Sequence, residues 1–457
     1  MTDLIVDRIL KDILVALNLP AALANRVTFG GDDRLPSCFP VSDLAAASIG
    51  AACAAVATLA AAGGRVANVS VDYRLASLWF GWSIRPEGWA MPSPWDSIAG
   101  DYLACDGWIK LHTNAPHHRA AALSALACEP TRDAVAAAVA ARHADAIEAA
   151  VVAAGGCAAR LMSRAEWAAH PQGQAVASEP IILWDDAASG ERRGWQPLPD
   201  RPLAGIRVLD LTRVLAGPVA TRFLAGFGAE VLRIDPPDWD EPGVIPEVSL
   251  GKRCARLDLR MPADRDTFTR LLAGADILVH GYRADALDRL GLGATARQAI
   301  RPGLIDVSLN AYGHGGPWSN RRGFDSLVQF SSGIAADGMM WRGANAPVSL
   351  PVQALDHATG YLIAAAAIRG VIARLSGEGL TCARLSLART ATLLSDHRTR
   401  PDDGPFVPAQ ESDYANAIER TDWGPARRLR PPAAINGIPM QWDRPAARLG
   451  SSAANWD

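Results

Sequence analysis

The chain has 457 residues, of which 49% are hydrophobic and 20% charged, and its formal net charge is −3. This length allows two to four domains, and the near-neutral charge argues against nucleic acid or an anionic membrane as a partner. Its seven cysteines are widely spaced without a C-x-x-C pair, which is typical of a reduced, cytoplasmic chain and indicates no metal site.

The first 99 residues begin with a predicted helix and loop over 1–37, and we expect no signal peptide there because no basic and apolar leader is visible. An Ala-rich run follows at 44–63. The run is long enough to cross a membrane, but alanine is only weakly apolar, so we predict a buried helix. A strand-like segment follows at 69–71.

Residues 100–190 predict a small α+β domain, with a strand at 108–111 and Ala-rich helices between residues 119 and 154. A polar, Pro-containing linker follows at 191–202. The last segment, 395–457, begins with a stretch rich in Pro, Arg and Asp, which predicts a connector and a closing segment.

Between residues 203 and 394, short β-branched runs alternate with helical patterns. The predicted strands are 206–210, 230–234, 277–279 and 304–308, and the predicted helices are 216–227, 263–272 and 284–290. This alternation predicts an α/β fold, a Rossmann-like doubly wound parallel sheet. Ligands bind such sheets at the carboxyl ends of the strands, here at the turn 212–217.

The sequence also contains an internal repeat. Residues 39–43 and 350–356 each hold a Pro-Val pair and an Asp, and each is followed by a long Ala-rich helix, a Gly turn and a strand. Low-complexity alanine composition can imitate such a repeat. Because the order of these features matches in both segments, we nevertheless interpret residues 1–99 as a partial second copy of the large domain, with Asp43 at the place of Asp356.

Five sequence blocks fall in order between Ile206 and Asp356. They are R-V-L-D-L-T-R-V-L-A-G-P, G-A-E-V-L-R-I-D, G-K-R-C-A-R-L-D-L-R, A-D-I-L-V-H-G-Y-R-A-D-A-L-D-R-L-G-L and R-G-F-D-S-L-V-Q-F-S-S-G. Their order and spacing resemble the class III CoA-transferases, the family of formyl-CoA transferase, carnitine CoA-transferase and 2-methylacyl-CoA racemase. The resemblance implies a large CoA-binding domain with a smaller α+β domain, and an interlocked homodimer. It further implies acyl-CoA and a carboxylic acid as substrates, without a permanently bound cofactor.

The resemblance places the family's nucleophilic carboxylate at Asp356, in P-V-Q-A-L-D-H-A-T-G, with Gly360 at the expected distance. A carboxylate that attacks a thioester can pass CoA on through an anhydride and an aspartyl-CoA thioester. An Asp before a helix is also a good cap, which stays ionised and accepts backbone N–H groups, so capping is the plainer alternative. The adjacent His357 is interpreted as a surface residue.

The same motif matches give ten positions for contacts with CoA. They are Val214, Leu215, Ala216, Leu257, Arg260, Gly281, Tyr282, Arg283, Arg289 and Phe324. A guanidinium suits phosphate because it offers paired donors, but Arg260 and Arg289 could equally lie in salt bridges on solvated faces. For Val214 and Leu257, simple packing is compatible with a contact to CoA.

Two departures from the family pattern narrow the function. Phe324 stands where the racemase has its catalytic His, which argues against racemase or isomerase chemistry. The small domain precedes the core instead of following it, as in a fusion of two half units, with Asp43 a relic or a cap. We expect a CoA-transferase, and the alternatives are a degenerate acyl-CoA-binding protein or an acyl-CoA racemase or isomerase of the same family. An NAD-dependent oxidoreductase is disfavoured because G-x-G-x-x-G is missing after the first strand.

Overall fold

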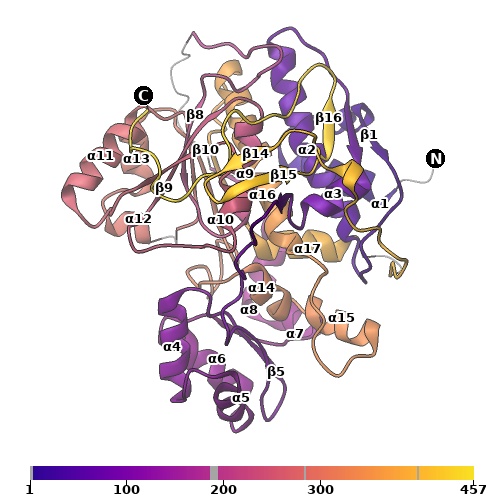
Figure 1. Ribbon diagram of the computed structural model, residues 1–457, viewed down its shortest axis with the longest axis vertical. Helices are drawn as coiled ribbons and strands as arrows, with labels where there is room; N and C mark the ends of the chain where they lie inside the picture. Colours follow the sequence, from indigo (N-terminus) through magenta and orange to yellow (C-terminus); the bar gives the residue numbers. More distant parts are fainter. Residues whose placement is uncertain (1–3, 186–193, 283–284, 399–400, 457) are drawn as a thin grey trace.

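The computed structural model describes residues 4–185, 194–282, 285–398 and 401–456, and its centre is a seven-stranded sheet in the order β10-β9-β8-β11-β12-β13-β7 (Figure 1). Neighbouring strands from β10 to β13 are parallel, and β7 is antiparallel to β13 at the edge. The strands are β7 (Leu183–Asp185), β8 (Arg207–Leu211), β9 (Glu230–Asp235), β10 (Lys252–Arg256), β11 (Ile277–His280), β12 (Ile305–Asn310) and β13 (Cys382–Ser386). The predicted parallel α/β sheet is confirmed.

Helices cover both faces of this sheet because alternate residues of each strand point to opposite sides. Val208 and Val279 face one core, which contains α9 and α16, whereas Leu209 and Leu278 face the other, which contains α11. The helices between the strands are α9 (Ala216–Gly226), α10 (Ile245–Val248), α11 (Pro262–Ala273), α12 (Ala286–Arg289), α13 (Ala294–Ile300), α14 (Asp325–Ser331), α15 (Ile334–Arg342) and α16 (Ala354–Ser376). The layers are those of a doubly wound fold.

The N-terminal segment adds a second, smaller α/β unit beside α16. It consists of α1 (Ile5–Ala16), the 3-10 helix η1 (Ala21–Arg26), β1 (Val27–Gly30), α2 (Val41–Ala62), β2 (Val69–Asp72) and α3 (Tyr73–Trp79). Both α2 and α16 are long and apolar enough to cross a membrane, and both lie largely buried against each other in the core. This is the place of a core helix, as the alanine-rich composition of α2 predicts.

The sequence repeat has a counterpart in the element order. The helix α2 lies between parallel strands β1 and β2 and is followed by α3, while α16 lies between parallel strands β12 and β13 and is followed by α17 (Leu387–Asp396). The two long helices pack side by side, α2 in purple and α16 in orange in Figure 1. The proposed duplication therefore rests on matching topology as well as on sequence.

The small domain has its own core and reaches the large sheet at two places. Its elements are β4 (Gly100–Leu103), β5 (Trp108–Leu111), α4 (Pro116–Leu126), α5 (Arg132–Ala140), α6 (Ala144–Ala153) and β6 (Ala158–Arg160). The chain then runs through α7 (Arg164–Ala169) and α8 (Pro171–Ser178) into β7 of the large sheet. Helix α14 packs on β5 and β6, so the segment that leads into α16 is held by the small domain.

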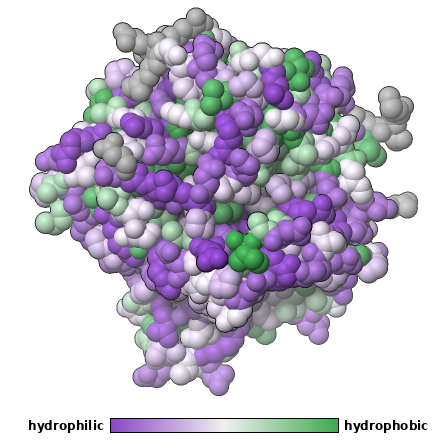
Figure 2. Space-filling model, turned by 45° about the horizontal axis from the view of Figure 1, so that its top comes forward, coloured by the Kyte–Doolittle hydropathy of each residue, from purple (hydrophilic) through white to green (hydrophobic). Residues whose placement is uncertain are grey.

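The C-terminal segment returns to the N-terminal third instead of forming only a connector. Its elements are η2 (Glu411–Asp413), β14 (Glu419–Thr421), β15 (Gly424–Arg428) and β16 (Ala433–Ile435); β15 pairs with β3 (Ile84–Pro86) and β16 with β2. Buried Glu247 binds Arg222 and Arg428, which ties α9, α10 and β15 together. The face drawn in Figure 2 is mostly polar, with apolar residues in small scattered groups.

Candidate active site

A cavity of about 390 Å³ lies where the carboxyl ends of β8, β11 and β12 meet the small domain. Residues 211–216, 281–282 and 309–311 follow or end these strands, and the opposite wall comes from the 319–324 segment and the start of α4. Asp356 at the start of α16 completes the lining. Both walls belong to one chain, and the cavity lies where parallel α/β sheets bind their ligands.

Two buried carboxyl groups lie together at the start of α16, and one of them, Asp356, lines the cavity. The Asp325 side chain accepts the backbone N–H groups of Leu355 (2.9 Å) and Asp356 (3.0 Å) and also the amide of Gln329. Burial, followed by the charge of Asp325, raises the pKa of Asp356 well above its usual value, and burial also raises the pKa of Asp325. Since the hydrogen bonds favour a charge on Asp325, Asp356 is the harder of the two carboxyl groups to ionise.

The interpretation of Asp356 as an ionised helix cap is wrong. Helix α16 begins at Ala354 after Gln353, and no side chain of its own caps it; the carboxylate of Asp325 takes the free N–H groups instead. The surface interpretation of His357 is also wrong, because its ring is buried and stacks on Phe80 at 5.2 Å. The environments of Asp356 and His357 are set by residues far away in the sequence, which the local pattern does not reveal.

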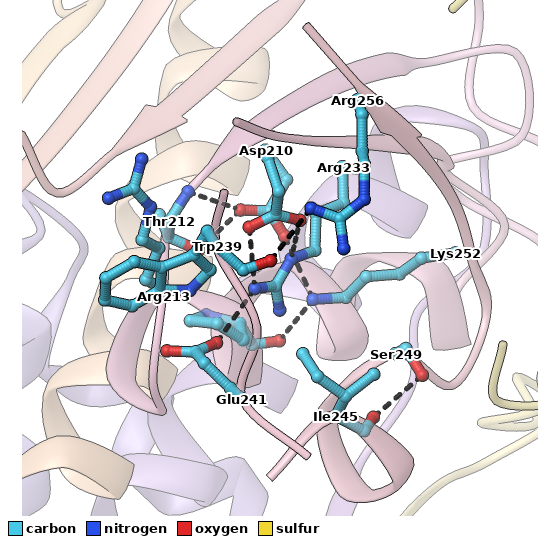
Figure 3. Close-up of polar contacts among 12 residues, drawn as sticks. Asp210, Thr212, Arg213, Arg233, Trp239, Glu241, Ile245, Ser249, Lys252 and Arg256 are labelled. Atoms are coloured by element: carbon cyan, nitrogen blue, oxygen red, sulfur yellow. Dashed lines mark hydrogen bonds and ion pairs between the residues drawn. The ribbon is translucent and has the colours of Figure 1, made fainter. Parts of the chain in front are cut away.

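A buried charge network supports the turn after β8 (Figure 3). Asp210 accepts from the hydroxyl groups of Thr212 and Thr221, at 2.5 Å each, and from Lys252 at 3.0 Å. Burial opposes ionisation of Asp210, but the charges of Lys252 and Arg233 hold its pKa below the usual value. Burial lowers the pKa of Lys252 to about 8. These contacts fix the end of the strand and the first turn of α9 in one arrangement.

The turn itself contains a strained residue that lines the cavity. Val214 has φ +63°, which a β-branched residue rarely adopts, and its N–H donates to Glu241 at 2.7 Å. The guanidinium of the preceding Arg213 lies 4.5 Å from the ring of Trp239 and donates to the Tyr282 hydroxyl at 3.1 Å. Strain held by a buried network is typical of a ligand-binding turn.

Arg256 holds the loop that closes this side of the cavity. Its guanidinium donates to the carbonyl groups of Pro236, Pro237 and Trp239 at 2.7–2.9 Å. Figure 3 shows Arg256 beside Arg233, whose guanidinium pairs with Glu241 at 3.0 Å. The loop thus presents Trp239 to the cavity and Glu241 to the turn.

Comparison with known proteins identifies the part of the chain that builds this site. The family model described as CoA-transferase family III matches residues 203–421. This part of the chain belongs to CoA-transferase family III. The match includes the strained turn after β8, both buried carboxyl groups and strands β8 to β13, but not the edge strand β7 or the small domain at residues 100–190.

Several curated proteins resemble the family III region. An acetyl-coenzyme A transferase of Hypoxylon pulicicidum is 33% identical over 44% of this chain and 34% of its own length. A probable fatty acyl-CoA transferase of Mycobacterium tuberculosis is 30% identical over 38% and 48%, and the mouse succinyl-CoA:glutarate CoA-transferase is 34% identical over 39% and 44%. The chain thus spans about a third to a half of the length of these curated relatives.

The solved structures that resemble the chain share only part of it. A crystal structure of the Mycobacterium tuberculosis protein has 27% identity and a TM-score of 0.39, and covers 43% of this chain and 57% of its own. A CAIB/BAIF family protein from Brucella suis has 25% identity and a TM-score of 0.37, and covers 50% and 65%.

The structure brings five of the ten predicted CoA-contact residues of the family III region to the cavity. Val214, Ala216, Gly281, Tyr282 and Phe324 line it together with Asp356. Leu215 and Leu257 are buried in the two cores beside the sheet. Arg260 is 67% exposed and pairs with Asp258, Arg289 is 71% exposed and pairs with Asp285, and Arg283 lies outside the described residues. Contacts of all ten with CoA stay predictions.

The twin position of Asp356 in the N-terminal unit is held by neighbours of its own. Asp43 is buried in the first turn of α2, accepts the Tyr73 hydroxyl at 3.0 Å and lies 3.5 Å from Arg34. It caps no helix, because α2 begins after Pro40 without a side-chain cap. A carboxylate held by two neighbours of its own, away from the family III cavity, fits a structural role.

Sequence reasoning missed the wall that comes from the small domain. His117 and His118 line the cavity from α4, and Arg213, Trp239 and Arg322 line it from the family III region. The two adjacent histidines after Pro116 could have been noted in the sequence as candidate site residues. Their approach to Asp356 depends on how the small domain packs, and no local pattern records that packing.

Proposed function

We propose that the protein is a CoA-transferase that moves CoA between an acyl-CoA and a carboxylic acid, with Asp356 as the nucleophile. The observation that carries this proposal is that Asp356 is the only carboxylate among the described residues lining the cavity, at the ends of the sheet strands. It lies beside the strained turn that the family resemblance assigns to CoA. The relatives named as CoA-transferases support the reaction class.

The reaction begins when ionised Asp356 attacks the carbonyl carbon of the acyl-CoA thioester. The carbon–sulfur bond breaks, the CoA thiolate leaves, and an aspartyl–acyl anhydride forms. The thiolate then attacks the aspartyl carbonyl, which gives an aspartyl-CoA thioester and releases the first acid as a carboxylate. The carboxylate of the second acid attacks the aspartyl-CoA thioester, which releases the CoA thiolate and forms a second anhydride. The thiolate then attacks the carbonyl carbon of the second acid in this anhydride. The products are the new acyl-CoA and free Asp356.

Asp325 acts through Asp356 and is a positioning residue. Its carboxylate holds the backbone N–H groups at the start of α16, which fixes the approach of Asp356 to the cavity. Its charge also raises the pKa of Asp356, so a proton must leave the pair before attack. A carboxylate of higher pKa is a stronger nucleophile, and the cost is a smaller ionised fraction at low pH.

Replacement of Asp356 by Asn tests the nucleophile, with Asp43→Asn as the matched control on the twin helix. Transfer is measured by mass spectrometry with acyl-CoA donors and a panel of fatty, mono- and dicarboxylic acids. We expect Asp356→Asn to lose activity by about 10⁴-fold or more and Asp43→Asn to keep it. Undiminished transfer by Asp356→Asn would remove the assignment.

The proposal extends to CoA contacts, assembly and location. Val214, Leu215 and Ala216 and the other predicted contacts would bind CoA, and thermal stabilisation by CoA but not by NAD supports that part. A protein that binds acyl-CoA by calorimetry but transfers to no acid would instead be a degenerate acyl-CoA-binding protein. The family resemblance supports a homodimer and the cysteine pattern supports a cytoplasmic location, and light scattering of the purified chain tests the dimer.

A further inference from the structure

The cavity is lined by a histidine whose ring nitrogens have no hydrogen-bond partner among the described residues. His118 is 3% exposed and lies in the first turn of α4, and neither of its ring nitrogens has a hydrogen-bond partner among the residues that the structure describes. Buried polar groups are nearly always satisfied, and leaving one unpaired costs about 1–3 kcal/mol. A side chain that lines a cavity in this state is arranged to bind something that enters the cavity.

His118 is a neutral hydrogen-bonding group at physiological pH. Burial, with the nearby positive charge of Arg322 among the lesser causes, lowers its pKa to about 3. A neutral imidazole has one N–H donor and one acceptor nitrogen. His118 can therefore donate to a carboxylate oxygen without taking up its proton.

The surroundings of His118 indicate an anionic ligand. His117 lies next to it, with ring centroids 4.1 Å apart, and Arg322 lines the same cavity. Asp356 is the single acidic residue in the described lining. Neutral donors beside an arginine suit a carboxylate, whereas an unsubstituted alkyl chain would leave His118 unpaired.

Phe324 relates this site to the reacting group. The His118 ring meets Phe324 edge-on at 5.8 Å, and Phe324 directly precedes Asp325, which holds the N–H of Asp356. No described hydrogen bond joins His118 to either carboxyl group. Both ring nitrogens of His118 are therefore available to a ligand, and a carboxylate that they hold can be the one that does not react at Asp356.

We propose that His118 binds the non-reacting carboxylate of a dicarboxylic acid, and that it selects such acids over monocarboxylic acids of the same length. The proposal rests on the proposed CoA-transferase function and names the substrate class for that site. It assigns the acid to the wall formed by α4 and Phe324, and leaves the turn at Val214 and Tyr282 to CoA.

The test compares glutarate with pentanoate as acceptors, which differ by a second carboxylate. We expect His118→Phe to lower kcat/KM for glutarate by about 10- to 100-fold through a higher KM, and to change pentanoate by less than about threefold. His118→Asn or His118→Gln, which keep an N–H donor, should restore part of the preference. His143→Phe, on the exposed rim of the same domain, is the control.

Equal losses for both acids, or a changed KM for the CoA donor, would overturn the proposal, because His118 would then act on the thioester or on CoA. Melting curves show whether the Phe variant folds. If it does not, an unchanged preference for glutarate in His118→Ala, which has no N–H donor, would also overturn the proposal. Calorimetric binding of glutarate to the CoA-saturated protein separates the two proposals. Binding that His118→Phe abolishes supports the site even where no transfer occurs.

Discussion

Replacement of Asp325 by Asn probes the buried carboxyl pair directly. The wild-type side chain accepts two backbone N–H groups and one amide, and its charge is the second cause of the raised pKa of Asp356, after burial. Asn keeps the size and one acceptor oxygen but removes the charge. The pKa of Asp356 should therefore fall while staying above its ordinary value, because burial is unchanged.

The expected size follows from these contacts. Removal of a charge in contact with a carboxyl group shifts its pKa by about 1–2 units, so the acidic limb of kcat/KM should move to lower pH by that amount. Bonds from N–H groups to a charged acceptor are roughly twice as strong as bonds to a neutral one. Weaker bonds to Leu355 and Asp356 should cost about 1–3 kcal/mol of stability and lower the activity plateau.

The assay is a pH profile of kcat/KM for acyl transfer, with stability followed by thermal melting. Asp337→Asn is the control, since Asp337 is a buried carboxylate that pairs with Arg398 at 2.7 Å and is not among the described cavity residues. It should lose stability without a change in the shape of the profile. An acidic limb that stays in place or moves to higher pH in Asp325→Asn would refute the electrostatic reasoning.

Three further predictions concern α16 and the turn. Asp356→Asn should melt at a higher temperature than wild type at pH 8 and at about the same temperature as wild type at pH 4. A raised folded-state pKa favours folding below about pH 4, and this stability is lost as pH rises, so a difference in melting temperature that is the same at both pH values would contradict it. Gly360→Ala should lower the free energy of unfolding by about 1–3 kcal/mol, because the added Cβ would lie 2.5 Å from the Ala216 carbonyl oxygen. CoA binding, measured by calorimetry, should also weaken, and a variant with wild-type affinity and stability would contradict the close contact. Val214→Gly should relieve the strain at φ +63° and raise the melting temperature while weakening CoA binding, and unchanged binding would show that the strained turn has no part in it.

The large sheet was predictable because its signal is local. Strands such as 230–234 and 277–279 are short apolar runs, and the observed β9 and β11 differ from them by one residue at most. The edge strand β7 was not predicted, since three residues carry no pattern and its partner β13 lies far along the chain. Whether such a short strand forms depends on pairing with a distant segment and not on the intrinsic propensity of its residues.

The site was predictable where one segment supplies it. Val214, Ala216 and Asp356 came from motifs, and the structure places all three at one cavity. The partners that set their chemistry were not visible: Asp325 supplies the cap of α16 from another helix, and His118 comes from the small domain. The sequence could not decide whether Arg289 binds CoA or forms a salt bridge, because Asp285, four residues earlier in the chain, can pair with it.

Trapping of the covalent intermediate tests the central claim most directly. The protein is incubated with acyl-CoA and hydroxylamine, digested, and mapped by mass spectrometry, with Asp356→Asn and Asp43→Asn treated in parallel. We predict a hydroxamate on the peptide that contains Asp356 in the wild type and in Asp43→Asn, and none in Asp356→Asn. Steady transfer of CoA without any modification at Asp356 would contradict the account.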